Sequence, residues 1–498
     1  MIASALGSAV YGVNASMIAI EVSIVQGTKL FIAGLPDSAI KESQHRIESV
    51  LKHIGCSMPR QRVIVNLAPA DIRKEGAAYD LPIALCILKA SKQHNLGKLD
   101  DYVVMGELAL DGTLRPVRGV LPIAIEAREK RYKGFVLPHE NAYEAAIVND
   151  LDIIPIKHIN EAIAFFAGTT PIAPIVTDTR ALFFSQANTY EVDFSDVQGQ
   201  ATIKRALEIA AAGGHNAIMI GPPGAGKTML AKRLATILPP FTLRETLETN
   251  KIYSVAGRLG KQDALISTRP FRAPHHTISD VALVGGGSIP QPGEISFAHN
   301  GVLFLDELPE FKRTVLEVMR QPLEERKVTV SRAKLTVDFP ANFMLIASMN
   351  PCPCGYYNHP QKECVCSPAA VQRYLHKVSG PLLDRIDLHV EVTPISFDQM
   401  TSNTKTEASS TIRARVVKAR ASQQERFKHH PTLYTNAMMP AAMVKKICAT
   451  SQVGGALLKA AIEKLDLSAR AYDRILKVSR TIADLDDSEA IQLSLIHI

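Results

Sequence analysis

Residues 221–228 constrain the fold of this chain more than any other stretch does. They read Gly-Pro-Pro-Gly-Ala-Gly-Lys-Thr and match the pattern G-x-x-x-x-G-K-[ST]. An apolar run at 217–220 precedes them and a helix-like run at 229–238 follows, which predicts a turn from a strand into a helix. The glycines of such a turn let consecutive backbone N–H groups point at one anion. The segment therefore predicts a phosphate-binding loop on an α/β sheet.

Different residue types in this loop suit different parts of a nucleotide. Lys227 places positive charge at the outer phosphates, and Thr228 offers a hydroxyl to Mg²⁺. The alternative, a chance glycine turn, is disfavoured because the strand before and the helix after are both predicted. The predicted nucleotide-binding residues are Gly221, Pro222, Pro223, Gly224, Ala225, Gly226, Lys227 and Thr228.

The composition is that of an ordinary globular protein. The chain has 498 residues, of which 46% are hydrophobic and 21% charged, and a chain of this length forms about two to four domains. A net charge of +7 permits a polyanionic partner but does not require one. No apolar run is long enough to span a membrane, and residues 1–5 lack the basic region of a secretion signal. We therefore expect a cytoplasmic protein with no membrane partner.

The pattern along the chain predicts an α/β multidomain protein. Pro171 and Pro174 interrupt regular structure and indicate a linker, and from about residue 408 the pattern is helical. The expected strands are 18–25, 63–67, 102–105, 134–137, 217–220, 301–305 and 343–348, and the expected helices include 37–53, 81–91, 121–130, 443–450, 455–465 and 469–485. The predicted divisions are a first domain at 1–168, a linker at 169–190, a nucleotide-binding domain with a parallel sheet at 191–400, a helical domain at 401–492 and a tail at 493–498.

Two acidic residues end a predicted buried strand after the phosphate loop. Asp306 can hold Mg²⁺ through water, and Glu307 is placed to orient and polarise an attacking water, the base role that phosphoryl transfer needs. Asn350 ends the next predicted strand and could reach the same water. By itself, Asn350 would indicate only a turn before Pro351.

Four of the seven cysteines fall within residues 352–366. They form two C-x-C hooks on either side of a loop, and four thiolates make a tetrahedral Zn²⁺ site. Because all four positions are filled, the pattern favours a closed structural site over a catalytic one. Reduced cysteines without a metal are the alternative, and His359 is a candidate substitute ligand. The candidate zinc ligands are Cys352, Cys354, Cys364 and Cys366.

Two further segments carry candidate contacts. Residues 324–340 predict two β-prone arms about a turn near 331–334, and Arg332 and Lys334 near the tip could follow a nucleic-acid backbone. A solvated hairpin with ordinary surface charges is the alternative. An insertion at 271–297 contains His275 and His276. We expect a structural or pore-loop role for them, because no further ligand stands at metal-binding spacing.

The order of these motifs resembles that of AAA+ ATPases, specifically the YifB/ComM family of the magnesium-chelatase-like branch. The phosphate loop, the acidic pair, Asn350 and the segments 196–200, 382–387 and 468–470 carry the resemblance, which extends to about residue 492. It implies ATP and Mg²⁺ as cofactors and a helical lid at the C-terminal end.

The same resemblance implies roles for three side chains. Asn350 would be sensor 1, Arg385 the arginine finger offered to a neighbouring subunit, and Arg470 sensor 2. A finger that acts in trans makes hydrolysis depend on assembly into a ring. Arg385 could instead pair with a neighbouring aspartate, and Arg474 is the alternative to Arg470.

Residues 73–81 and 105–112 resemble the Lon (S5-type) protease domain. Its Ser–Lys dyad needs a hydroxyl nucleophile and an amine base, but the aligned positions hold Ala78 and, approximately, Leu121. We therefore expect a Lon-like domain without peptidase activity, which serves assembly or DNA contact.

Residues 493–498 read Leu-Ser-Leu-Ile-His-Ile and differ from the polar sequence in which the family's final helix continues. A transposon mosaic-end adapter read in frame encodes these residues, so we expect a non-native tail. A genuine apolar tail is the alternative.

The expected function is that of an ATP-driven hexameric DNA motor, a helicase or branch-migration enzyme in recombination or natural transformation. Its expected partners are branched or single-stranded DNA and recombination proteins. The alternative from another class is a chelatase-like AAA+ chaperone that remodels a protein partner. An ATP-dependent protease is disfavoured by the missing dyad.

Overall fold

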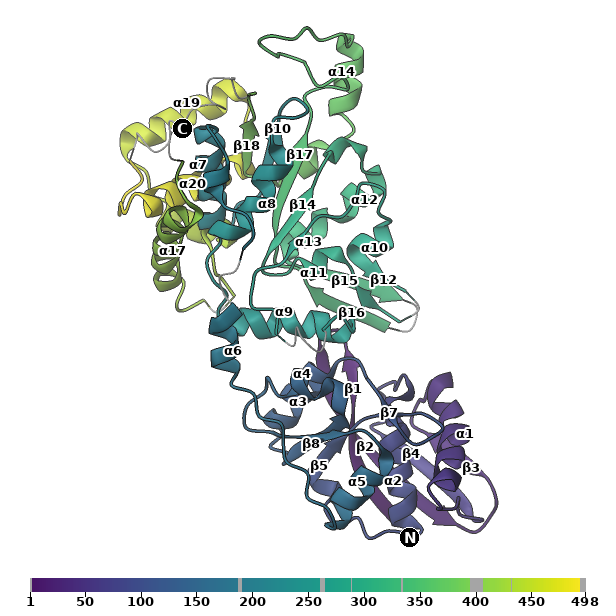
Figure 1. Ribbon diagram of the computed structural model, residues 1–498. Helices are drawn as coiled ribbons and strands as arrows, with labels where there is room; N and C mark the ends of the chain where they lie inside the picture. The colour runs from purple at the N-terminus through teal and green to yellow at the C-terminus, as the bar shows by residue number, and fades with distance from the viewer. Residues whose placement is uncertain are drawn as a thin grey trace. The chain divides into compact units, whose positions relative to one another are not determined.

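The structure, a computed structural model, describes residues 2–186, 190–259, 265–287, 289–332, 335–394, 406–430 and 432–492 (Figure 1). The chain divides into two compact units. The first consists of Met1–Ala187 and Leu243–Ser267, and the second of Asn188–Thr242 and Thr268–Ile498. Among the described residues, no helix is both long and apolar enough to cross a membrane.

A seven-stranded mixed sheet forms the centre of the first unit, in the order β3-β4-β2-β1-β5-β8-β9. β1, β2 and β4 are antiparallel neighbours, and the other neighbouring strands run parallel. The strands are β1 (Ile2–Tyr11), β2 (Asn14–Val25), β3 (Leu30–Ala33), β4 (Arg62–Ala68), β5 (Tyr102–Val104), β8 (Gly134–Pro138) and β9 (Asp152–Ile156), with a separate pair β6 (Glu107–Leu108) and β7 (Leu114–Arg115). The helices are α1 (Ser38–His53), α2 (Asp80–Ala90), α3 (Val120–Glu129), α4 (Ala142–Ala145), α5 (Ile159–Ala167) and α6 (Thr179–Gln186).

The periodicity of apolar side chains explains most of the strands and helices of this unit. In β2, Ile18, Ile20 and Val22 are fully buried and alternate with more exposed residues, as one face of a sheet requires. α2 is apolar on nearly all sides and is buried along most of its length. The strands and helices that the sequence predicts before residue 168 are all present. β1 is not among the predicted strands, because its alanine, glycine and serine residues give a weak apolar alternation.

One helix belongs to the first unit although it follows the phosphate loop in the chain. α9 (Leu243–Val255) packs against α3. Ser254 carries part of this contact, because its carbonyl oxygen accepts from Gly119 N at 3.0 Å and its hydroxyl accepts from Leu121 N at 3.2 Å. Residues 243–267 thus lie with the Lon-like part and not with the nucleotide-binding part, to which chain order assigns them.

A five-stranded parallel sheet, in the order β11-β14-β17-β10-β18, forms the centre of the second unit. The three strands predicted in this part are confirmed as β10, β14 and β17. The strands are β10 (Ala217–Ile220), β11 (Phe271–Arg272), β14 (Val302–Leu305), β17 (Met344–Met349) and β18 (Leu388–Glu391), with hairpins formed by β12 (Gly285–Gly286) with β13 (Gln291–Pro292) and by β15 (Lys327–Arg332) with β16 (Leu335–Pro340). The helices around them are α7 (Ala201–Gly213), α8 (Lys227–Ile237), α10 (Asp280–Val284), α11 (Glu294–Phe297), α12 (Arg313–Val318), α13 (Arg320–Glu325), α14 (Pro368–Leu375) and α15 (Gly380–Leu383).

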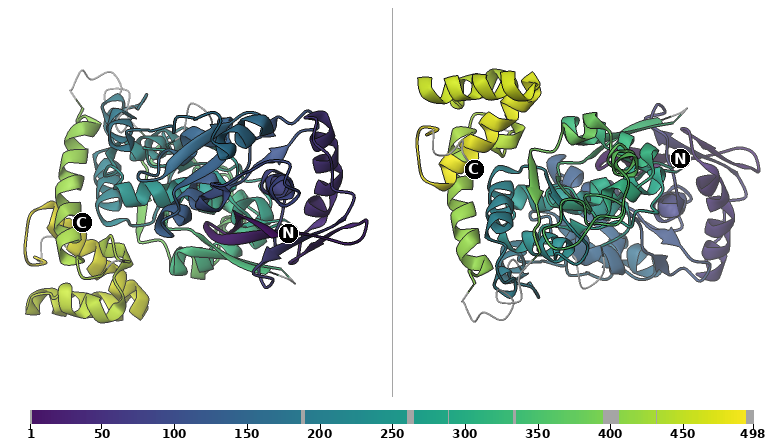
Figure 2. Two further views of the ribbon diagram at one scale, coloured as in Figure 1. Left: turned by 90° about the horizontal axis from the view of Figure 1, so that it is seen from below. Right: turned by 90° about the horizontal axis from the view of Figure 1, so that it is seen from above.

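The end of the described chain is helical, as predicted. Its helices are α17 (Ser409–Arg426), α18 (Ala441–Ile447), α19 (Gln452–Leu465) and α20 (Ala469–Leu485). α17 and α20 pack against each other and against α7 of the sheet layer, and Figure 2 shows them, in green and yellow, beside the teal α7. Leu458 and Leu476 lie in a separate apolar core of these helices. The predicted tail at 493–498 lies outside the described residues.

Candidate nucleotide site

Three neighbouring strands deliver the predicted site residues to one edge of the sheet. β17 lies between β10 and β14, and the phosphate loop, Asn350 and Asp306 each follow the carboxyl end of one of them. The carboxyl ends of parallel strands meet at the same edge, which is where α/β proteins bind ligands. The structure therefore brings together residues that lie far apart in the chain.

The phosphate loop has the backbone that its glycines predict. Gly224 and Gly226 have φ values of 78° and 82°, in the left-handed region where glycine carries no steric penalty. Lys227 begins α8, and its Nζ donates to the carbonyl oxygens of Gly221 at 2.7 Å and Pro222 at 2.9 Å, and to Asn350 Oδ1 at 3.0 Å. Burial lowers the pKa of Lys227 from its ordinary value. Lys227 and Asn350 are thus in direct contact.

The candidate Mg²⁺ ligands are also in contact. Thr228 Oγ1 donates to Asp306 Oδ2 at 2.6 Å, and the hydroxyl of Ser348 on β17 donates to the other carboxylate oxygen. A hydroxyl and a carboxylate are the hard oxygen ligands that Mg²⁺ prefers. The sequence does not single out Ser348, because a serine inside a buried strand shows its partner only when the strand order is known.

Glu307 stands at the exposed end of this edge. Its φ is 55°, and its side chain is 57% exposed. The carboxylate lies 3.5 Å from Nδ1 of His276, whose ring lies 4.1 Å from that of His275, measured between ring centroids. The insertion at 271–297 therefore reaches the candidate catalytic base, a placement that the spacing of two adjacent histidines does not reveal.

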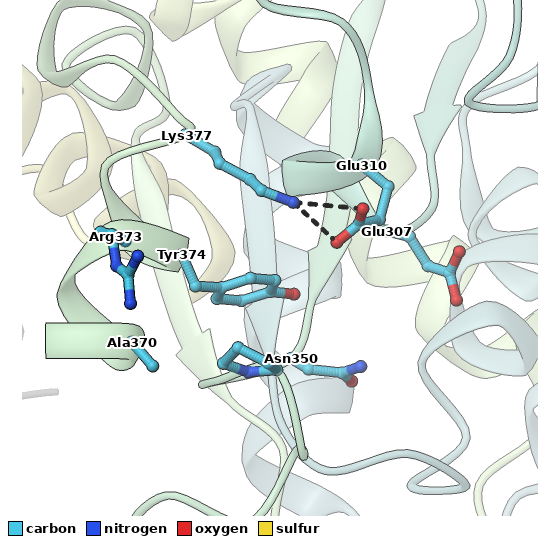
Figure 3. Close-up of a pocket in the computed structure, with 8 residues that line it drawn as sticks. Glu307, Glu310, Asn350, Ala370, Arg373, Tyr374 and Lys377 are labelled. Carbon is cyan, nitrogen blue, oxygen red and sulfur yellow. Dashed lines mark hydrogen bonds and ion pairs between the residues drawn. The ribbon is translucent and has the colours of Figure 1, made fainter. Parts of the chain in front are cut away.

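A cavity of about 480 Å³ opens beside Glu307 and Asn350 (Figure 3). Arg373 and Tyr374 of α14 line it, together with Lys377, whose Nζ lies 3.2 Å from a carboxylate oxygen of Glu310. Burial raises the pKa of Tyr374 to about 12, so its hydroxyl stays protonated as a hydrogen-bond donor. Arg373 and Lys377 are not among the site residues that the sequence predicts near Glu307.

A second cavity, of about 340 Å³, is lined by the phosphate loop. The loop itself, the start of α8 and the 196–200 segment form one wall, and residues between the two cysteine hooks form another. The lining residues are Val197, Gln200, Pro222, Pro223, Gly224, Ala225, Gly226, Met229, Leu230, Tyr356, His359, Gln361, Lys362 and Pro394. This cavity is the space next to the phosphate loop that a nucleoside can occupy.

The four candidate zinc ligands converge. The sulfur atoms of Cys352, Cys354, Cys364 and Cys366 all lie within 4.8 Å of one another. Four thiols at this separation fit one tetrahedral Zn²⁺ ion, whose Zn–S bonds are about 2.3 Å long. His359 is not part of this group, and its Nδ1 accepts from the backbone N–H groups of Gln361 and Lys362, both at 3.0 Å.

The candidate arginines have different surroundings. Arg385 is 15% exposed, and its guanidinium donates to Glu324 Oε1 at 2.5 Å and to the carbonyl oxygen of Pro381. Its ion-pair partner is therefore not one of the neighbouring aspartates. Arg470 is exposed in the first turn of α20. Arg474 instead donates to the carbonyl oxygen of Ile386 at 3.3 Å.

The predicted hairpin is present, with β15 antiparallel to β16 in a register that pairs Arg332 with Leu335. Val328 and Phe339 are buried, whereas Lys327 and Asp338 form an ion pair of 2.8 Å on the exposed face. Lys334 and the side chain of Arg332 lie outside the described residues, so their contact with nucleic acid stays a prediction.

Three family models match the chain. The model described as magnesium chelatase, subunit ChlI, matches residues 193–400. The model described as subunit ChlI of Mg-chelatase matches residues 20–141, and that of the subunit ChlI C-terminal part matches residues 406–497.

Individual relatives match over nearly the whole chain. Competence protein ComM of Haemophilus influenzae is 44% identical over 96% of this chain and 93% of its own length. The uncharacterized protein YifB of Escherichia coli is 43% identical over 97% of this chain and 93% of its own length. Lon protease 2 of Bacillus subtilis is 32% identical over 28% of this chain and 26% of its own length.

Proposed function

Because this chain belongs to the YifB/ComM family of magnesium-chelatase-like AAA+ ATPases, we propose that it is a hexameric, ATP-driven DNA motor that acts in recombination or natural transformation. The observation that carries the ATPase part is the contact between Lys227 and Asn350 beside the pair Thr228–Asp306. The printed name of the Haemophilus relative, competence protein, supports a role in DNA uptake. Such a motor works in the cytoplasm.

The proposed hydrolysis uses residues from the three strand ends. Lys227 neutralises the outer phosphates, and Thr228 and Asp306 hold Mg²⁺, which supplies charge stabilisation at the phosphoryl oxygens. Glu307 takes a proton from the attacking water, and Asn350 orients that water. Arg470 contacts the phosphates of its own subunit. Arg385 acts on the site of the neighbouring subunit, where an arginine stabilises the charge of the transition state.

The cysteine cluster is proposed to hold structural Zn²⁺. Its donor set of four thiols is filled from this chain alone and leaves no position open for a substrate. The metal would join the two hooks that flank residues 355–363 and thereby stiffen the segment after Asn350.

The DNA part of the proposal rests on the β15–β16 hairpin and on the chain's net charge of +7. Arg332 and Lys334 at the tip are proposed to contact phosphates, and other recombination proteins are proposed partners. The inert Lon-like unit fits a platform and not a peptidase, because Ala78 and Leu121 offer neither nucleophile nor base. A chelatase-like chaperone is the second candidate, since all three family models carry the name of a chelatase subunit.

The test compares the ATPase rate of the full chain with and without single-stranded or branched DNA at several salt concentrations. DNA should stimulate hydrolysis, and the stimulation should weaken as salt rises, because salt competes for phosphate contacts. Replacing both Arg332 and Lys334 with alanine should remove the stimulation and lower the salt slope by about two. Lys327→Ala, at the base of the hairpin, is the matched control and should keep the stimulation.

Absence of stimulation by any DNA, together with an unchanged rate in the tip variant, would contradict the motor and favour the chaperone. If Lys327→Ala loses the stimulation equally, the assignment of Arg332 and Lys334 as the DNA contacts is contradicted, because a general change of charge would then explain the loss.

A further inference from the structure

The loop between the two cysteine hooks lies directly against the phosphate loop. A methyl group added at Gly355 would come within 2.4 Å of Pro223 Cδ, a distance that no real contact shows. Figure 1 shows this segment, before α14, arching at the carboxyl ends of β10 and β17. The cysteine loop and the phosphate loop thus form one packed surface, although 131 positions separate these two residues.

The same loop supplies a wall of the 340 Å³ cavity. Tyr356, His359, Gln361 and Lys362 line it from the cysteine loop, and Val197, Met229 and Leu230 supply apolar lining. Apolar lining suits a base, and polar side chains suit a ribose and its phosphates. The cavity therefore has the chemical division that a nucleotide requires.

Contacts within the loop hold these side chains together. The Tyr356 and His359 rings meet edge to face with centroids 5.6 Å apart. Lys362 Nζ lies 4.8 Å from the centre of the Tyr356 ring. His359 Nδ1 accepts from two backbone N–H groups of the loop at 3.0 Å. The aromatic pair thus places the Lys362 ammonium at the cavity.

The loop has no helix or strand of its own between the two hooks. Its conformation depends on what joins Cys352 and Cys354 to Cys364 and Cys366. Cys352 is fully buried and lies two positions after Asn350. A metal bound by all four sulfurs would fix both ends of the loop, and without the metal the loop regains conformational entropy.

We infer that metal occupancy of the cysteine cluster sets the affinity of this chain for its nucleotide, by holding the 355–362 segment as the outer wall of the binding cavity, with Lys362 as a nucleotide-positioning residue. This inference rests on the proposed function only in taking the nucleotide to be ATP. The cysteine cluster would then act in nucleotide binding and not in catalysis, because residues 355–362 would contact the nucleotide away from Glu307.

The first experiment measures binding of a fluorescent, non-hydrolysable ATP analogue with Mg²⁺ to the full chain as purified, after zinc removal by a chelator, and after zinc is returned. Removal should weaken binding by about tenfold or more, and zinc should restore it. In steady-state assays KM should rise by a similar factor while kcat at saturating ATP changes by less than about twofold.

The second experiment leaves the metal in place. Lys362→Gln should keep the zinc content and the unfolding temperature but weaken binding of the analogue by about three- to tenfold, because a positive contact is lost. Glu363→Gln is the matched control, since this exposed neighbour does not line the cavity, and it should bind like the wild type.

Unchanged analogue binding after zinc removal, or in Lys362→Gln, would overturn the inference, as would a purified chain without zinc that binds the analogue equally well before and after zinc is added. If the zinc-loaded wild type binds no ATP analogue at all, the ATPase assignment itself fails. Binding without stimulation of hydrolysis by DNA would contradict only the motor.

Discussion

At the scale of single residues, Glu144 shows how a buried carboxyl group ties two distant segments together. Its Oε1 accepts from Ser254 Oγ at 2.5 Å and from Leu121 N at 3.2 Å. Burial raises the pKa of Glu144, and these hydrogen bonds reduce the rise only in part. Leu121, which is expected to fall near the lysine position of the Lon pattern, thus has its N–H in a structural contact.

The raised pKa predicts a dependence of stability on pH. The folded state favours the neutral carboxyl, so its contribution is fully present below the ordinary pKa of glutamate and is lost as pH rises through the folded pKa. Glu144→Gln, which stays neutral, should show a smaller loss of Tm than the wild type when pH rises from about 5 to 8. Glu129→Gln, which removes an exposed carboxylate on α3, is the control.

Identical pH profiles of Tm for Glu144→Gln and the wild type would contradict this assignment. Differential scanning calorimetry of the full chain provides the measurement.

At the scale of elements, two arginines near the start of α20 have different surroundings. Arg470 is exposed in its first turn, whereas Arg474 donates to Ile386 O and lies 3.9 Å from Asp387. Asp387 also lies 3.2 Å from His215, which is fully buried, so this group joins the helical part to the sheet. Arg470 and Arg474 thus differ although they lie one helical turn apart. The side chain of Arg470 is exposed, whereas that of Arg474 takes part in a structural contact.

We predict that Arg470→Ala lowers ATPase kcat by at least about tenfold with little change in Tm, because it removes a phosphate contact. Arg474→Ala should instead lower the free energy of unfolding by about 1–3 kcal/mol, because Asp387 loses a partner while buried. Steady-state kinetics and thermal unfolding of both variants separate the two effects. The opposite pattern, a stable but inactive Arg474→Ala, would make Arg474 the sensor.

At the scale of the whole molecule, the proposed site is incomplete within one chain. Lys227 is proposed to bind phosphate in its own subunit, and Arg385 is proposed to complete the site of the next. Within the subunit, Arg385 is held by Glu324, which is half exposed. A contact across a ring interface that attracts the guanidinium must therefore compete with this ion pair.

A mixing experiment tests this division. Lys227→Ala and Arg385→Ala should each be nearly inactive alone. In randomly mixed rings about one interface in four joins an intact phosphate loop to an intact arginine, so hydrolysis should recover to roughly a quarter of the wild-type rate. Sedimentation confirms that the variants assemble. If co-assembled rings recover no activity, Arg385 does not act in trans.

Local sequence patterns predict many of the motifs and elements of this protein. The phosphate loop, the acidic pair after β14, the paired cysteine hooks and the hairpin are all readable because each depends on neighbours a few residues away. Strand and helix periods likewise predict most elements. The backbone conformations of Gly224 and Gly226 follow from residue type alone.

Tertiary structure decided which of these local features meet. The order of the parallel strands sets Ser348 against Asp306 and His276 near Glu307, and packing places α9 with the Lon-like unit. The same packing brings the cysteine loop against Pro223 of the phosphate loop. Sequence determined the chemistry of each segment because that chemistry is local, whereas the contacts between segments depend on close packing across the fold, which no single segment specifies.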